Sequence, residues 1–315
     1  FLFQPLESMF QEKKNIIVKS SGVLSIVPFE TFVMADNRYV IEKYNIFNSP
    51  SLSIALKAYK KRYTNINKSV LLFGNPLLKN TRVSAKKILS YKNLQYLSYR
   101  IYKKKKLKRN LQREFKKLNR LPLKMIAHSF AEMRIIKKIA GNSDIIAKGD
   151  CNEAFFKKFG KSGNLKAYRF LHFSTYAIMV REMPELTAVM LTENFGAKQA
   201  NEGLLNLREL AALKNRADMV VVSSGGVQGA TYALGEVTWD LCFALLKSGS
   251  KSAILPQWNY DDKARVLFWK LVYEKIIKEK MTHGNAVNEV KRAFLTGSIK
   301  NRSVDEYTEN ISKLK

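Results

Sequence analysis

The stretch Asp218-Met-Val-Val-Val-Ser-Ser-Gly-Gly-Val-Gln-Gly-Ala230 decides the fold class. Its three consecutive valines form a β-branched apolar run, which is typical of a strand buried on both faces of a parallel sheet. Small residues follow, and then an amphipathic run from Glu236 to Leu246 predicts a helix. In α/β proteins, ligands and catalytic groups lie at the carboxyl ends of such strands. The segment from Ser223 to Gly229 is therefore where we expect any chemistry.

Further apolar runs predict the rest of the fold. Strands are expected at 69–73, 144–147, 167–175, 187–191 and 252–255. Helices are expected at 122–139, 152–159, 206–213, 261–280 and 285–295. Strands that alternate with helices predict an α/β fold, with a mostly parallel central sheet and helices on both faces.

The first part of the chain has a different pattern. Residues 15–18 and 23–27 flank a turn that contains Gly22, which predicts a β-hairpin. An extended segment at 39–41 and a helix at 52–63 follow. We therefore expect an N-terminal extension at 1–65, made of a hairpin and a helix, and a core at 66–315.

Composition excludes several classes of protein. With 46% hydrophobic residues the chain is globular rather than disordered. No apolar run approaches the length of a membrane-spanning helix. Two cysteines and three histidines are too few for a disulfide framework or a zinc cluster, so we expect no metal and no cofactor. A reducing compartment, the cytoplasm, is the default expectation. Because the sequence starts with Phe, we expect a processed chain or a piece of a longer one.

The formal net charge of +29 has two interpretations. It indicates a polyanion partner such as nucleic acid or an anionic membrane face, or it reflects a bias toward lysine in the whole sequence. The charge is densest in an insertion at about 84–120, which predicts either a solvated segment or a docking arm for nucleic acid or an acidic partner. The basic patch consists of Lys103, Lys104, Lys105, Lys106, Lys108, Arg109, Arg113, Lys116 and Lys117.

Seven motifs occur in the order found in the CHAT domain, a caspase-like domain often attached to tetratricopeptide repeats. Leu171-His-Phe-Ser-Thr175 resembles the "L-H-F-A-T-H-G" strand of that family. Val222-Ser-Ser-Gly-Gly-Val-Gln228 stands where the family has "L-S-A-C-Q-T-G". The other five segments are 22–30, 44–51, 71–76, 202–209 and 246–262. The basic insertion has no counterpart in the pattern.

The resemblance implies a caspase-like fold and a cysteine peptidase, in which a histidine at one strand end activates a cysteine at the next. Carried over by position, the histidine falls on Tyr176 and the cysteine falls on Gly225. Both members of the dyad are therefore expected to be missing. The family also implies that tetratricopeptide repeats precede this segment in the parent chain.

Three other residues are weak candidates for catalysis. Ser223 and Ser224 are nucleophile-type side chains at the expected place, but a serine hydroxyl needs a base. His172 precedes Tyr176 by four residues on the same strand, which puts it roughly 13 Å from the strand tip. We therefore interpret His172 as a buried structural residue.

Acidic and aromatic residues near the expected cleft are candidates for peptide binding: Trp258, Asp261, Asp262, Glu182 and Glu185. The alternative interpretation is a solvated loop for the glutamates and helix capping for the aspartates. Together these features favour a catalytically inactive pseudoprotease that binds a protein or peptide. A hydrolase that uses Ser223 or Ser224, and a module that binds nucleic acid through the basic insertion, are the alternatives.

Overall fold

The computed structural model describes residues 4–10, 12–63, 66–77, 109, 128–179, 184, 187–192, 203–223, 234–257 and 261–299. Its centre is a five-stranded parallel sheet with the strand order β10-β9-β5-β3-β4. The strands are β3 (Lys68–Pro76), β4 (Asp144–Lys148), β5 (Tyr168–Ser174), β9 (Met219–Val222) and β10 (Ala253–Ile254). This arrangement confirms the predicted fold class.

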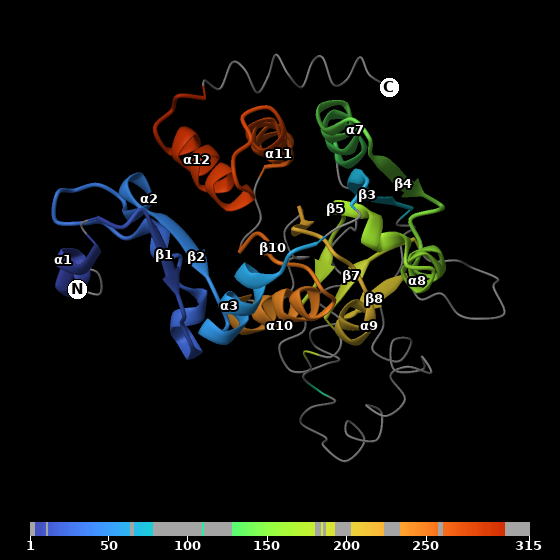
Figure 1. Cartoon of the computed structure of the whole chain (residues 1–315), viewed down its shortest axis with the longest axis horizontal. Helices are drawn as coiled ribbons and strands as arrows, with labels where there is room; N and C mark the ends of the chain where they lie inside the picture. Colours follow the sequence, from blue (N-terminus) through green and yellow to red (C-terminus); the bar gives the residue numbers. More distant parts are fainter. Residues whose placement is uncertain are drawn as a thin grey trace.

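Helices cover both faces of the sheet (Figure 1). One face is covered by α7 (Ser129–Ala140), α11 (Asp262–Ile277) and α12 (His283–Leu295). The other face is covered by α8 (Glu153–Lys161), α9 (Leu207–Ala212) and α10 (Leu234–Lys247). Within the described ranges, every helix is too short or too polar to cross a bilayer.

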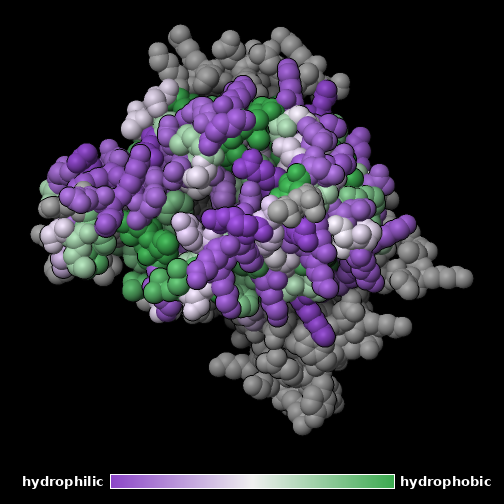
Figure 2. Space-filling model, in the orientation of Figure 1, coloured by the Kyte–Doolittle hydropathy of each residue, from purple (hydrophilic) through white to green (hydrophobic). Residues whose placement is uncertain are grey.

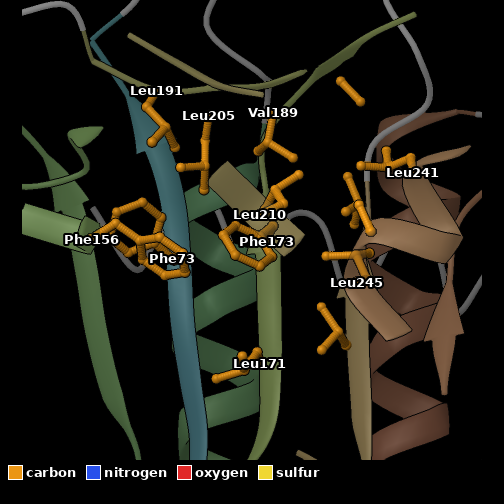
Figure 3. Packing of buried hydrophobic residues seen from close by; sticks show 14 of the residues in the cluster. Phe73, Phe156, Leu171, Phe173, Val189, Leu191, Leu205, Leu210, Leu241 and Leu245 are labelled. Carbon is orange, nitrogen blue, oxygen red and sulfur yellow. The ribbon is translucent and has the colours of Figure 1, made fainter. Parts of the chain in front are cut away.

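Side chains of β5 alternate between the two faces, because successive residues of a strand point to opposite sides. Phe170 joins the core under α7 and α11. Leu171 and Phe173 join the core on the side of α8, α9 and α10, where Phe73 and Phe156 pack against Phe173 (Figure 3). The central strand is thus buried on both faces, as its apolar sequence predicts.

The strand predicted at 187–191 does not belong to the central sheet. It forms β7 (Ala188–Met190), which pairs antiparallel with β6 (Ala177–Ile178) and β8 (Leu204–Asn206) in a separate three-stranded sheet. Val189 is fully buried beside the central sheet. Its apolar character correctly indicated burial, but burial does not specify which strands are hydrogen-bonded neighbours.

The predicted N-terminal hairpin is wrong. β1 (Asn15–Val18) pairs parallel with β2 (Asn45–Asn48), and the expected second strand is the 3-10 helix η2 (Gly22–Ile26). Gly22 has a φ of 58°, and the hydroxyl of Ser25 donates to the Gly22 carbonyl over 2.6 Å. This local bond closes a helical turn, so the apolar residues of 23–27 are not available to a ladder.

The remaining elements are short. The segment at 39–41, predicted as extended, instead starts α2 (Val40–Lys43), because the Glu42 carboxylate accepts from the Tyr39 backbone N–H and caps a helical turn. The helix predicted at 52–63 is α3 (Leu52–Lys60). The others are η1 (Gln4–Leu6), α1 (Glu7–Phe10), η3 (Phe29–Thr31) and η5 (Asn164–Ala167).

Polar contacts join the N-terminal extension to α12. The backbone N–H of Ile46 donates to the Asn288 side chain over 3.2 Å. The guanidinium of Arg292 donates to the Ile41 carbonyl and to the Asn45 side chain, over 3.0 and 2.9 Å. The described part of residues 1–65 therefore packs on the core through these bonds, while the domain boundary at 65/66 stays a prediction.

Gly74 of β3 lies opposite Ser174 of β5 in the sheet. A Cβ atom at this position would lie 2.4 Å from the carbonyl oxygen of Ser174. We expect Gly74→Ala to force the strands apart and to destabilise the protein by about 1–3 kcal/mol. Urea unfolding measures this, with Gly149→Ala as the control because nothing lies within 4 Å of a Cβ there. Equal midpoints for the two variants would show that β3 and β5 separate without cost.

Candidate functional site

The carboxyl ends of β5 and β9 lie side by side. The backbone N–H of Ser223 donates to the carbonyl of Phe173 over 2.8 Å, which continues the β5–β9 ladder by one residue. Ser174 and Ser223 are fully buried, and both hydroxyls donate to one carboxylate, that of Glu132. This carboxylate is the centre of the site.

Glu132 is fully buried, and its carboxylate accepts hydrogen bonds from four side chains. Its Oε1 accepts from Ser223 Oγ over 2.6 Å, from Ser174 Oγ over 2.8 Å and from His172 Nε2 over 2.8 Å. Its Oε2 accepts from Arg265 Nε over 2.8 Å. A buried charge with this many partners is compensated by both an opposite charge and hydrogen bonds.

Two helices place the charged pair. α7 presents Ser129, Glu132 and Met133 to the sheet, and the Ser129 hydroxyl lies 2.7 Å from the carbonyl oxygen of Ser174. α11 begins at Asp262 and carries Arg265 in its first turn, where the side chain is only 3% exposed. Arg265 also forms an ion pair with Asp262. Glu132 and Arg265 therefore tie both helices to the ends of the central strands.

The environment sets the pKa of Glu132. Burial by itself raises the pKa of this carboxyl, but the positive charge of Arg265 and the hydrogen bonds from His172 and Ser223 outweigh burial and lower the pKa to about 2. The carboxylate is therefore ionised at neutral pH. It is also a very weak base, because its pKa is so low.

This shift makes stability depend on pH. The folded pKa lies below the unfolded value of 4.5, so the stabilisation is complete above about pH 4.5 and is lost as the pH falls toward 2. We expect the wild type to lose on the order of 3 kcal/mol more over this range than Glu132→Gln. Urea unfolding at a series of pH values measures the difference. Parallel curves for the two proteins would contradict the assignment.

His172 is fully buried beneath the strand tips. Because an ionised carboxylate only accepts, His172 Nε2 carries the proton that bonds Glu132. Its Nδ1 lies 3.3 Å from the hydroxyl of Tyr273, and its ring packs edge-on against Trp269. Both ring nitrogens therefore have partners inside the core, so neither is directed at a substrate.

Tyr176 follows the end of β5 and is half-buried. Burial raises the pKa of its hydroxyl, the negative charge of Asp262 raises it further, and Arg265 acts in the opposite direction. The hydroxyl thus keeps its proton near neutral pH and cannot accept one from a nucleophile. Gly225, the matching position after β9, lies outside the described residues, as does Ser224.

The cysteines do not offer a replacement nucleophile. Cys151 is fully buried, and burial raises the pKa of its thiol. Burial also raises the pKa of the Cys242 thiol, to about 12. Since the thiolate is the reactive form, both side chains are poor nucleophiles near neutral pH.

The two aspartates proposed for binding have local structural contacts. Asp261 caps α11, where its Oδ1 accepts from the backbone N–H groups of Lys263 and Ala264 over 2.9 and 3.0 Å. Asp262 is paired with Arg265. Their role in binding stays a prediction. The other predicted residues lie outside the described ranges, namely Trp258, Glu182, Glu185 and the basic patch apart from Arg109, which is exposed.

Glu132 and Arg265 were absent from the residues predicted for the site. A signal was present, because each is a charged residue on a helix face that otherwise carries core residues such as Met133, Ile136, Val266 and Trp269. A single acid on the apolar face of one helix and a single base on that of another indicate a buried pair. The sequence does not show that these two helices are neighbours.

Comparison with known proteins supports the resemblance found in the sequence. The model of the CHAT domain family matches residues 1–310, which is nearly the whole chain. No curated protein matches this sequence.

Proposed function

Since this chain belongs to the CHAT domain family, we propose that it is a catalytically inactive, caspase-like domain that acts by binding a protein or peptide. Catalysis in the family, as the resemblance implies it, needs a cysteine and a histidine at neighbouring strand ends. Those two positions are occupied by Gly225 and Tyr176. Gly225 has no side chain that could act as a nucleophile, and the Tyr176 hydroxyl keeps its proton near neutral pH and is a poor base.

One observation supports this proposal above the others: Ser223 and His172, the remaining candidates for catalysis, are both hydrogen-bonded to the carboxylate of Glu132. Ser223 donates its proton to a carboxylate that is too weak a base to remove it, and the serine has no exposed surface. His172 directs its Nε2 at the same carboxylate. A hydrolase built on Ser223 would have to break this network before it could reach a substrate.

Two alternatives have weaker support. A hydrolase that uses Ser224 would still need a base, and Tyr176 keeps its proton. Binding of nucleic acid rests on the net charge of +29 and on the basic insertion, and charge by itself does not identify a partner. Inactivity together with protein binding is therefore the function we favour.

A peptide library tests the proposal. The protein is incubated with peptides of randomised sequence, and the peptides that co-elute with it in size-exclusion chromatography are identified by mass spectrometry. We expect a subset of sequences to be retained and recovered intact. New peptide termini that accumulate with time would contradict inactivity, and recovery of no sequence above background would contradict peptide binding.

A further inference from the structure

The helix α3 (Leu52–Lys60) exposes an apolar stripe. Leu52, Leu56 and Tyr59 are 66%, 59% and 76% exposed. They recur at spacings of four and three residues, so they lie on one side of the helix. None of the nine residues of α3 is buried, and its half-buried residues Ile54, Ala55 and Ala58 lie on another side. Figure 2 shows hydrophobic next to hydrophilic surface in the part of the molecule that α3 occupies in Figure 1.

The carboxyl end of α3 is bonded to the core of the protein, and the residue before its amino end caps its first turn. Ser51 caps the first turn by accepting from the backbone N–H of Ile54 over 3.2 Å. After the last turn, the ammonium of Lys61 donates to the carbonyls of Gly249 and Ser250 over 3.0 and 3.2 Å. Tyr63 also donates to Gly249. Isolated helices shorter than about 12–15 residues are marginal in water, so α3 depends on such anchors.

Positive charge borders the stripe. Lys57 and Lys60 are exposed on the adjacent side of α3, and Arg62 lies 5.9 Å from the ring centroid of Tyr59. From Lys43 to Arg113 the sequence contains no aspartate or glutamate. The neighbouring sequence therefore offers no acidic side chain that could pair with Lys57, Lys60 or Arg62.

We propose that α3 is the docking site for an acidic amphipathic helix of another protein. Apolar residues of that helix would cover Leu52, Leu56 and Tyr59, and its acids would face Lys57 and Lys60. The charges argue against a second copy of this chain, because two α3 helices in contact would bring four lysines together. They also argue against the basic insertion of this chain as the occupant. The inference does not depend on the state of the catalytic positions.

Fluorescence anisotropy tests this with a synthetic helix that carries leucines along one face and glutamates elsewhere. We expect Leu56→Ser combined with Tyr59→Ser to weaken its binding about tenfold or more. We expect Lys57→Glu combined with Lys60→Glu to reverse the preference, so that a second peptide with lysines in place of the glutamates binds better. These side chains are exposed, so the fold is retained, as circular dichroism will verify.

The control variant is Lys158→Glu combined with Lys161→Glu. These lysines are also exposed and three residues apart on a helix, α8, so the variant changes the net charge by the same amount. It should keep the preference for the acidic peptide. The proposal is wrong if both charge variants behave alike, because binding then follows net charge rather than α3. It is also wrong if Leu56→Ser changes the oligomeric state in sedimentation, because a second copy of the chain would then cover the stripe. Tighter peptide binding after removal of residues 300–315 would contradict it too, because that segment of the chain itself would then be the occupant.

Discussion

Replacing Arg265 with methionine should destabilise the protein by about 3–5 kcal/mol, because the carboxylate of Glu132 would remain buried without its opposite charge. The shape of the side chain is largely kept, so the effect comes from charge. Equilibrium unfolding in urea at neutral pH measures it. Arg169→Met is the control, since Arg169 is half-exposed in its ion pair with Asp218. Such pairs contribute about 1 kcal/mol or less.

A double variant separates loss of charge from loss of packing. Glu132→Gln keeps a carbonyl oxygen that accepts from Ser174 and Ser223 but removes the negative charge. Combined with Arg265→Met, it should recover about 1–3 kcal/mol relative to the sum of the single effects. If the two single effects simply add, Arg265 does not compensate Glu132 in the folded protein.

Placing a histidine and a cysteine at the two positions that the family pattern assigns to the dyad should create a reactive thiol. We expect the variant with Tyr176→His and Gly225→Cys to react with a peptidyl acyloxymethyl ketone at position 225. The imidazole would favour the thiolate, which is the form that attacks. Mass spectrometry after a time course gives the rate.

The variant that carries Gly225→Cys without Tyr176→His is the matched control, and it should react at least about 100-fold more slowly, because general-base assistance is typically of that size or larger. Equal rates for the two variants would mean that positions 176 and 225 are not within reach of each other. The positional assignment from the family pattern would then be incorrect.

The central sheet was predictable because its strands are apolar on both faces. Val220–Val222 and Leu171–Phe173 have the composition of doubly buried strands, and they pair as neighbours in the sheet. The strand at 187–191 shows the limit of this reasoning. Its residues are buried, but its backbone bonds go to β6 and β8, and apolarity does not encode that choice.

The N-terminal extension and the polar network were harder to predict, for two physical reasons. At Gly22 a hydrogen bond from the Ser25 hydroxyl supports a helical turn instead of a hairpin, and the pattern of apolar residues does not reveal this bond. The contact between Glu132 and Arg265 joins residues far apart in sequence, so it follows only from the packing of α7 on α11. Burial of His172 was predicted from its depth in the strand, and its carboxylate partner was not.

Intact-mass spectrometry of the wild-type protein tests directly whether the chain lacks a reactive nucleophile. The protein is incubated near neutral pH with a fluorophosphonate and, separately, with a peptidyl acyloxymethyl ketone. We predict no change in mass with either probe, because Ser223 is bound to Glu132 and both cysteines hold their protons. A stoichiometric adduct on Ser223, Ser224, Cys151 or Cys242 would contradict the assignment of this chain as an inactive member of its family.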